Sequence, residues 1–300
     1  MKKFMTTSAI AVAFVLMLSV SSCKNDPDVN IPLIKYILID EEYMDVKSGL
    51  VAYNDSLAMG YNNDMQLVNV DGLYQDFDLY YDEAGRIEKV EIFNDQSYKA
   101  LYSSYIEFTW AANTVTAQEY YGPNEPTWYK TVITFDENDK IEKIEYFDQP
   151  NKAEWYLSYY SEYTYTNKNL TLTEGYYPEF TKSGEVRQHS FRKTTPLEVS
   201  SGKGLAPTLV AMSEVTYDSK TNPFVMYPGL AILFADEMPQ IYTSKNNPTN
   251  ESNVEYYEGT YTWDVDYTYE FDGKGYPIEI VQFESYDGWS YMETWTIAYK

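Results

Sequence analysis

The stretch "YYDEAGRIEKVEIF" runs from Tyr80 to Phe93, and the stretch "TFDENDKIEKIEYF" runs from Thr134 to Phe147, 54 residues further along. In both, apolar residues alternate with polar ones on either side of a short turn. An alternation of period two is typical of a strand with one wetter face. Aspartate suits the first position of a type I turn, and Gly or Asp suits the fourth, where φ is positive. Each stretch therefore predicts a β-hairpin with a bulged turn.

A third copy of this pattern lies near the C-terminus, at residues 269–275, and is followed by Pro277. Proline cannot donate to a strand ladder, so its strand must start late or lie at an edge. Two looser hairpins, at 106–116 and 163–172, alternate with the repeated ones. Because a lone hairpin is marginal in water and stacked hairpins bury a shared face, the repeats predict an all-β fold. We expect a long twisted antiparallel meander of repeated β-hairpins.

The remaining segments predict one helical interruption and two breaks in the hairpin pattern. Residues 228–238 contain the apolar run Gly-Leu-Ala-Ile-Leu-Phe-Ala, which predicts a short buried helix. Residues 178–207 hold many of the basic residues and suggest a sub-boundary within a β-hairpin repeat domain that covers 34–300. The polar stretch 244–253, which contains Pro248, predicts a loop.

The first 23 residues are typical of an export signal with a lipid-attachment site. Two lysines precede an apolar stretch, 8–20, that is too short to span a bilayer. The small residues that follow lead to Cys23 and resemble the lipobox of bacterial lipoproteins, in which residues 1–22 are removed and the cysteine is lipidated. Two or more acyl chains make a lasting anchor. We predict a membrane anchor at Cys23 and a tether at 23–33; an ordinary secretory signal is the alternative.

The cysteine and histidine counts and the net charge exclude several kinds of metal site and binding partner. Cys23 is the only cysteine and His189 the only histidine, which excludes an intramolecular disulfide, a Cys-based metal site and a multi-histidine metal site. Removal of residues 1–22 takes away two lysines, leaving 20 Lys and Arg against 46 Asp and Glu. This negative field repels nucleic acid, so nucleic acid is not an expected partner. No motif indicates a metal or a cofactor, and we predict neither.

The turns and the N-terminus carry a family resemblance. The Tyr/Phe-Asp-x-x-Gly hairpins resemble the YD repeats of the Rhs and teneurin shell proteins. Together with the lipobox, the segments 220–224, 244–248 and 272–277 resemble uncharacterised lipoproteins of Bacteroidota over most of the mature chain. The resemblance implies an all-β lipoprotein of the outer membrane and no particular activity. Only two acids lie in Lys24–Asp28, which leaves both a periplasmic and a surface-facing location open.

Aromatic doublets near the strand ends supply the candidate binding residues. Adjacent strand residues point to opposite faces, so each doublet presents one ring outward if its partner is buried. Tyr and Trp rings suit stacking on sugars or anchoring a protein partner. The alternative is cross-strand packing, which contributes roughly 0.2–1 kcal/mol per pair. The candidate ligand-binding residues are Trp128, Tyr129, Trp155, Tyr156, Tyr177 and Tyr257.

These features favour a non-catalytic binding module for glycan or protein in the cell envelope. One alternative is a structural subunit of an envelope assembly. Another is a glycoside hydrolase, which needs two carboxylates about 5–10 Å apart. Nothing in the sequence marks one such pair, so we do not expect an enzyme and assign no catalytic residue.

Overall fold

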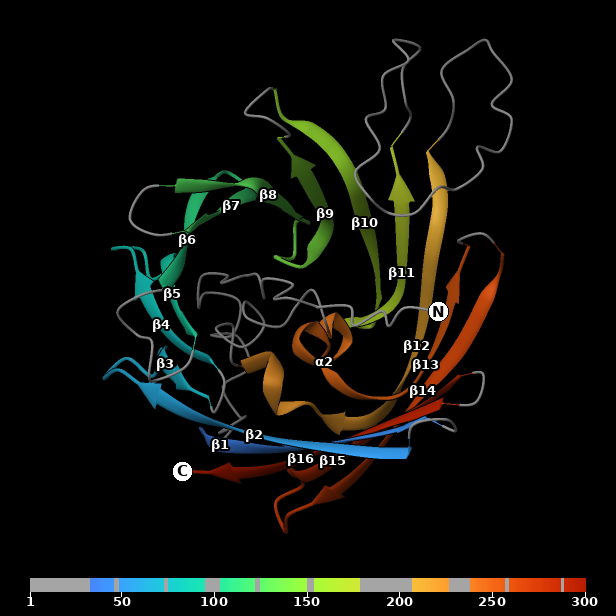
Figure 1. The fold of residues 1–300 in the computed structure, drawn as a ribbon. Coiled ribbons are helices and arrows are strands. Elements are labelled where there is room, and N and C mark those ends of the chain that lie inside the picture. Colours follow the sequence, from blue (N-terminus) through green and yellow to red (C-terminus); the bar gives the residue numbers. More distant parts are fainter. Residues whose placement is uncertain are drawn as a thin grey trace.

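The computed structural model describes residues 33–45, 49–72, 75–94, 103–121, 125–149, 154–178, 207–226, 238–256, 259–286 and 289–300. Within these ranges, sixteen antiparallel strands are each hydrogen-bonded to their neighbours in chain order. The first strand also pairs with the last, so the sheet closes into a barrel (Figure 1).

The strands are β1 (Ile34–Asp45), β2 (Gly49–Tyr61), β3 (Leu67–Asp71), β4 (Gln75–Tyr81), β5 (Ile87–Asn94), β6 (Ser103–Ala111), β7 (Thr114–Tyr121), β8 (Glu125–Phe135), β9 (Ile141–Asp148), β10 (Tyr156–Thr166), β11 (Asn169–Tyr177), β12 (Thr208–Thr221), β13 (Asn246–Glu255), β14 (Tyr261–Phe271), β15 (Pro277–Tyr286) and β16 (Trp289–Tyr299). A 3-10 helix, η3 (Pro223–Met226), and a short α-helix, α2 (Pro239–Thr243), lie between β12 and β13.

The antiparallel all-β prediction is confirmed, and the meander proves to be closed. β1 and β16 pair from Ile34 opposite Tyr299 to Asp45 opposite Trp289, with one register shift between Ile34 and Tyr36. The sequence predicted a meander but not its closure into a barrel, because hairpin repeats indicate only which consecutive strands pair. A closed sheet has no free edge to saturate.

The repeated hairpins turn as the sequence predicts. The fourth turn position has φ values of 77°, 60° and 90° at Gly85, Asp139 and Gly275. In the first copy the Asp82 carboxylate accepts hydrogen bonds from the backbone N–H of Ala84 and of Arg86, each at 2.9 Å. The aspartates of the other two copies accept the same two bonds at 2.8 to 2.9 Å. Aspartate thus fixes the entry of each turn and a residue with positive φ fixes its exit.

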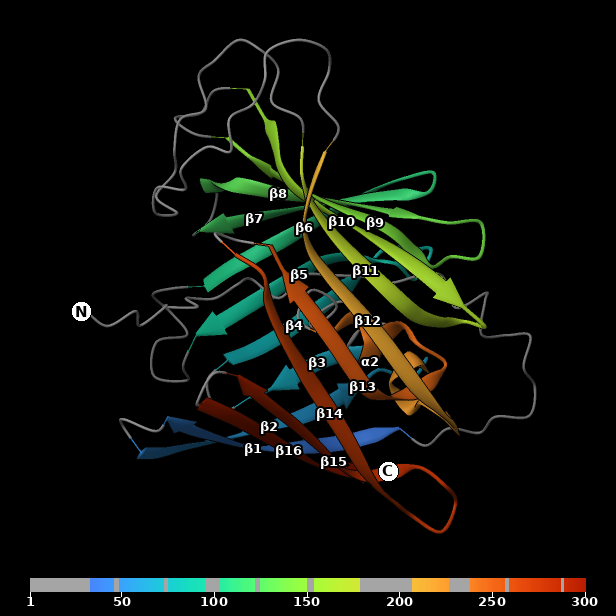
Figure 2. The same ribbon diagram turned by 90° about the vertical axis from the view of Figure 1, so that its right-hand side faces the viewer.

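Successive connections between strands lie at alternate ends of the barrel, because consecutive antiparallel strands alternate in direction. We call the end with the repeated turns, at 82–85, 136–139 and 272–275, the turn end. The end that holds the connections after β1, β3, β5 and each later odd-numbered strand is the loop end. Figure 2 shows the strands running obliquely between the two ends.

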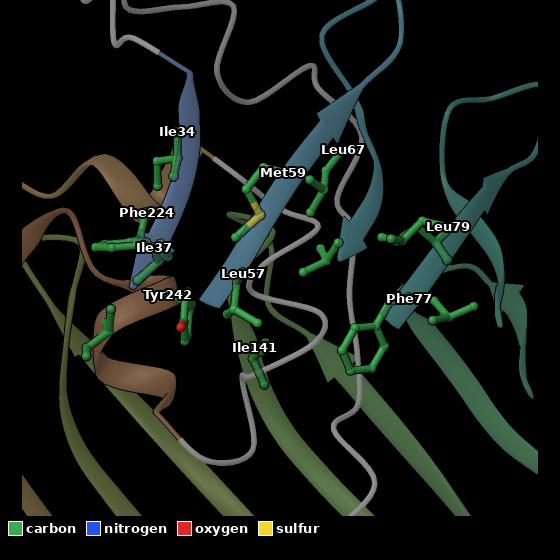
Figure 3. Packing of buried hydrophobic residues seen from close by; sticks show 14 of the residues in the cluster. Ile34, Ile37, Leu57, Met59, Leu67, Phe77, Leu79, Ile141, Phe224 and Tyr242 are labelled. Carbon is green, nitrogen blue, oxygen red and sulfur yellow. The ribbon is translucent and has the colours of Figure 1, made fainter. Parts of the chain in front are cut away.

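The hydrophobic core fills the turn-end half of the barrel interior. Alternate strand residues point inward and form one buried cluster, part of which is shown in Figure 3. α2 and η3 lie inside the ring of strands (Figure 1) and contribute Phe224, Ile241 and Tyr242 to the cluster. The Phe224 ring packs edge-on against Trp295 of β16, with ring centroids 5.8 Å apart. Sixteen strands enclose a wide interior, so these helices supply apolar contacts that the strands alone cannot reach.

The outer face is charged around its whole circumference. The strand residues that alternate with the core residues include Asp40, Glu42, Asp78, Glu91, Glu107, Lys130, Lys143, Glu145, Glu162, Glu174, Glu214, Asp264, Asp266, Glu270 and Glu279. On the lipid face of a barrel, a lysine or arginine costs about 2–4 kcal/mol near the bilayer midplane, and an aspartate or glutamate costs less. The outer face of the described strands is therefore suited to water rather than to lipid.

Helices are few in the part of the chain that the structure describes. None of those described is long and apolar enough to cross a membrane. The predicted helix at 228–238 falls mostly on 227–237, which lie outside the described residues. The observed helices, η3 and α2, lie on either side of that segment.

Two other predictions along the chain can be compared with the structure. The predicted loop at 244–253 is wrong, because residues 246–255 form β13. Polar side chains of β13 donate hydrogen bonds to side chains of the neighbouring strand β14: Asn250 donates to Asp266 at 3.0 Å, and Ser252 donates to Asp264 at 2.6 Å. Pro277 is the first residue of β15, as the predicted late start requires. Residues 179–206, around the suggested sub-boundary, lie outside the described residues, and β11 and β12 pair on either side of them.

A pair of alanine substitutions in one turn isolates the effect of positive φ. A Cβ at Gly273 or at Gly275 would meet nothing within 4 Å, but only Gly275 has positive φ, at 90°. We expect Gly275→Ala to destabilise the fold by about 1–2 kcal/mol, because an L side chain is strained there. Gly273→Ala should be neutral or stabilising by up to about 1 kcal/mol. Chemical denaturation measures both; equal effects of the two substitutions would contradict the turn assignment.

Candidate functional site inside the barrel

Toward the loop end, the inward-facing positions change from aliphatic to aromatic and acidic. On β16, Ile297 and Trp295 belong to the core, and Glu293, Tyr291 and Trp289 are the next inward positions toward the loop end. β7, which lies far from β16 in the strand order, changes in the same way. The interior therefore has an apolar half toward the turn end and a polar, aromatic half toward the loop end.

We call the inward-facing aromatic and acidic residues of the loop-end half the inner rim. Its aromatic members are Tyr43, Tyr53, Tyr121, Tyr129, Tyr146, Tyr156, Tyr159, Tyr177, Tyr261, Trp263, Tyr286, Trp289 and Tyr291. Its acidic members are Glu41, Asp55, Glu119, Asp148, Glu251, Glu255, Glu284 and Glu293.

Several inner-rim side chains are exposed although they face into a closed barrel. Tyr129 is 62% exposed, Tyr121 is 58% exposed and Tyr53 is 50% exposed. Aromatic side chains in a filled interior would be buried, as those of the core are. The loop-end half of the interior is therefore in contact with solvent at these three residues.

One part of the inner rim is a row of side chains on adjacent strands. Tyr129 of β8 lies opposite Asp148 of β9, which lies opposite Tyr156 of β10. The Tyr156 hydroxyl donates a hydrogen bond to Asp148 Oδ2 at 3.2 Å. A carboxylate is thus held between two aromatic rings on a single face of the sheet.

The row continues through ring contacts to β11. The Tyr159 ring contacts that of Tyr146, with centroids 5.6 Å apart, and that of Tyr177, with centroids 5.9 Å apart. Gly175 makes room for this arrangement: a Cβ at that position would lie 1.9 Å from the Tyr159 hydroxyl oxygen. The missing side chain on β11 therefore sets where the Tyr159 ring lies.

A second part of the inner rim spans the closure between β1 and β16. The Tyr43 ring lies between those of Tyr53 and Tyr291, with centroid distances of 6.3 and 4.6 Å. Glu41 and Glu293 are directly opposite each other in the β1–β16 register. The Tyr291 hydroxyl donates to Glu293 Oε2 at 2.7 Å, and the Trp295 indole N–H donates to Glu293 Oε1.

Burial and neighbouring negative charges raise the pKa of Glu41 and Glu284. Burial raises the pKa of Glu41, and the negative charges of Glu293 and Asp55 raise it further. Burial likewise raises the pKa of Glu284, with a further rise from the charge of Glu251. Several carboxylates are therefore gathered on this face of the described strands.

Helix α2 contacts one of these carboxylates, that of Glu251, from the turn-end side. Gln240 Nε2 of α2 donates to Glu251 Oε2 at 2.8 Å and to the Tyr267 hydroxyl at 2.9 Å. Ser213 Oγ donates to the other Glu251 oxygen at 2.6 Å. Glu251 is thus fully engaged, although burial still raises its pKa.

Glu119 differs from Glu251 because one of its carboxylate oxygens is not engaged. The residue is only 3% exposed, and its Oε1 atom has no hydrogen-bond partner. Burial raises the pKa of Glu119 to about 7, against a smaller lowering by a hydrogen bond from Ser104. The charge of Glu119 in turn adds to the burial that raises the pKa of Tyr121, so the two side chains are close.

No lysine or arginine in the described ranges belongs to the inner rim. Lys89, Lys130 and Lys143 lie on the outer face, where each Nζ stacks on an aromatic ring at 4.6, 4.7 and 4.1 Å from the centroid. The other basic residues of these ranges are at the turn end: Lys35, Arg86, Lys140, Lys168, Lys220, Lys245, Lys274 and Lys300. Over the same ranges, no three His, Cys, Asp or Glu side chains converge in a way that could hold a metal ion.

The predicted ligand-binding residues that the structure describes lie on two different faces of the barrel wall. Tyr129, Tyr156 and Tyr177 all lie on the inner rim. Trp128 is on the outer face, and Trp155 lies against the outer-face Lys130 at 4.7 Å. Tyr257 and the lipidation candidate Cys23 lie outside the described residues.

The sequence did not predict the inner-rim residues that the pairing of β1 with β16 brings together. Glu41, Tyr43 and Tyr53 belong to segments whose pairing with β16 no local pattern indicates. The one available signal is the period-two series Tyr291, Glu293, Trp295, which marks a strand face that mixes aromatic and acidic side chains.

Solved structures resemble this chain in overall fold, and two porin-like proteins are among them. A porin-like protein from Bacteroides uniformis shares 12% identity at a TM-score of 0.45, with 89% of this chain and 98% of that chain covered. A porin-like protein from Bacteroides vulgatus shares 10% identity at a TM-score of 0.47, with 90% and 99% covered. No protein-family model and no curated protein matches the sequence.

The buried carboxyl of Glu119 gives a pH-dependent prediction. Its pKa is about 7 in the folded chain against 4.5 for an ordinary Glu, so its stability contribution is present below pH 4.5 and is lost as the pH rises through 7. Glu119→Gln should therefore stabilise the fold at pH 8 by up to about 3 kcal/mol and change little at pH 4.5.

Thermal melting at the two pH values measures this difference. Glu107→Gln, at an exposed outer-face position on the adjacent strand β6, is the matched control. A stability gain from Glu119→Gln that is equal at pH 4.5 and pH 8 would show that Glu119 does not titrate as a buried carboxyl.

Proposed function

We propose that the protein is a non-catalytic binding module for glycan or protein in the cell envelope, and that the inner rim is its binding face. The observation that carries the proposal is the exposure of Tyr121, Tyr129 and Tyr53 on the inside of a closed barrel. Each leaves a large ring in water, and burying apolar surface contributes about 25 cal/mol per Å². A ligand that covers these rings gains that free energy.

The chemistry of the inner rim suits recognition as well as stacking. Tyrosine offers a flat apolar ring with a hydroxyl at its edge, which fits both sugar rings and protein side chains. Asp148, held between Tyr129 and Tyr156, can accept hydrogen bonds from a hydroxyl or N–H group that stacks there. The strands that carry these groups are paired on both sides, so the face is held rigid before a ligand arrives.

We further propose that the barrel is attached to the outer membrane by lipid on Cys23. The lipobox-like sequence before Cys23 supports this anchor, and residues 23–33 then supply a tether. The charged outer face of the described strands favours a barrel that stands in water beside the bilayer. The inner rim would meet ligands in the aqueous compartment.

A glycoside hydrolase acting at the same face is the second candidate. Glu41 and Glu293 are register partners on β1 and β16, and burial raises the pKa of both. A raised pKa is what a general acid for glycoside cleavage requires. Incubation of the protein with the oligosaccharides that it binds, followed by product analysis, separates the two functions: shorter products that Glu293→Gln abolishes would make the protein an enzyme.

Adjacent residues on β8 provide a matched test of the binding face. Tyr129 faces inward and Trp128 faces outward, and both are exposed, at 62% and 49%. We expect Tyr129→Ala to weaken binding of a glycan-array or pull-down ligand by about tenfold or more, as for an aromatic anchor. Trp128→Ala should change the affinity less than twofold.

The same comparison should be made with Tyr156→Ala, which removes the other ring beside Asp148. Unchanged melting temperatures would show that the variants are folded. Loss of binding in Trp128→Ala with full binding in Tyr129→Ala would place the site on the outer face and refute the proposal.

A further inference from the structure

Charge is distributed differently on the two faces of the barrel wall. The outer face pairs acids with its own lysines: Lys89 Nζ lies 2.6 Å from Glu91 and 4.6 Å from the Tyr105 ring centroid. Lys143 Nζ similarly lies 2.9 Å from Glu145 and 4.1 Å from the Tyr160 ring centroid. Each group combines a carboxylate, a tyrosine and an ammonium.

The inner rim repeats the carboxylate and the aromatic ring of this combination, and the described residues supply no ammonium group beside them. At the closure, Glu41 and Glu293 lie beside the ring series that is centred on Tyr43. Across the barrel, Glu119 lies beside Tyr121. No lysine or arginine among the described residues faces either group.

The free oxygen of Glu119 is an independent sign of a missing donor. A buried carboxylate oxygen without a hydrogen bond forfeits about 1–3 kcal/mol, and charged groups forfeit more. Glu119 Oε1 is such an atom, on a residue that is 3% exposed and inward-facing next to the exposed ring of Tyr121. A donor that reached this oxygen from the interior would remove the penalty.

We infer that the ligand of the inner rim is cationic and presents ammonium or guanidinium groups to its carboxylates and tyrosine rings. Such groups donate charge-assisted hydrogen bonds to carboxylates and are attracted to the faces of aromatic rings. The inference rests on the proposed function, because it assigns a ligand class to the same face.

Other ligand classes fit the inner rim less well. A neutral glycan could stack on the rings, but it would leave the carboxylates at the closure repelling one another. Nucleic acid would be repelled by all of them. A bound divalent metal ion needs several converging carboxylates, and the described residues contain no such group.

Calorimetry with defined probes tests the inference on the chain from residue 23, with Cys23→Ser to keep it in solution. The probes are spermine, a seven-residue lysine peptide and maltoheptaose, each at physiological salt. Spermine and the lysine peptide carry the same ammonium chemistry, and their relative affinities show whether a free polyamine or a basic protein segment is preferred. We expect at least one of them to bind and maltoheptaose to bind more weakly.

Two charge-matched double variants separate the inner rim from general acidity. Glu41→Gln with Glu119→Gln replaces two inner-rim carboxyl groups, and Glu107→Gln with Glu162→Gln replaces two carboxyl groups on the outer face. We expect the inner pair to weaken binding of the cationic probe at least tenfold and the outer pair to weaken it less than twofold. Equal losses would mean nonspecific attraction to an acidic surface and would overturn the inference.

The outcomes also distinguish this inference from the proposed function. Binding of maltoheptaose that Tyr129→Ala abolishes, with no binding of either cation, would uphold the binding face and refute its cationic ligand. Cation binding that Tyr129→Ala and the inner pair both leave unchanged would refute both.

Discussion

The pairing of β1 with β16 is the constraint on which the other features depend. Without it, the sheet has two free edges and no interior; with it, each strand has one face toward a shared interior and one toward the outside. Because side chains alternate with a period of two, closure assigns every residue to one face at once, and a slip of one position would exchange the faces of a whole strand. The register from Ile34–Tyr299 to Asp45–Trp289 thus places Ile37 in the core, Asp40 outside and Glu41 on the inner rim.

Closure divides the side chains into three environments with separate roles. The turn-end interior is apolar and is completed by α2 and η3, which stabilise the barrel. The outer face is charged and balances some of its acids with lysines. The loop-end interior combines exposed aromatic rings with carboxylates, and burial and neighbouring charges raise the pKa of two of them, Glu41 and Glu284. A surface that is costly to leave unoccupied, held on a scaffold that is already rigid, is the physical basis for the proposed binding function.

Local features of the fold could be predicted from the sequence, and features that depend on closure could not. The entry aspartates and the positive-φ exits of the turns at Asp82–Gly85 and Asp136–Asp139 are properties of four residues, so the hairpins followed from them. β13 was missed because its polar side chains form cross-strand hydrogen bonds that need the partner strand to be known. Tyr129, Tyr156 and Tyr177 were predicted as members of aromatic doublets. Which ring of the Trp128–Tyr129 pair faces inward could not be predicted, because it depends on which alternate residues of β8 point into the barrel. The acids and tyrosines of β1 and β2 met those of β16 only because the first and last strands pair.

A disulfide across the closing pair of strands tests this account most directly. Leu38 of β1 and Thr296 of β16 are register partners on the outer face, so cysteines at both positions should meet the geometric requirement for a disulfide. In a chain with Cys23→Ser, we expect the pair Leu38→Cys and Thr296→Cys to form a disulfide within one molecule and to raise the melting temperature. The control pair Leu38→Cys and Thr164→Cys, with Thr164 on the distant strand β10, should stay reduced. Free thiols or only intermolecular dimers in the closing pair, in a protein that otherwise melts normally, would show that the sheet is open and would contradict the account.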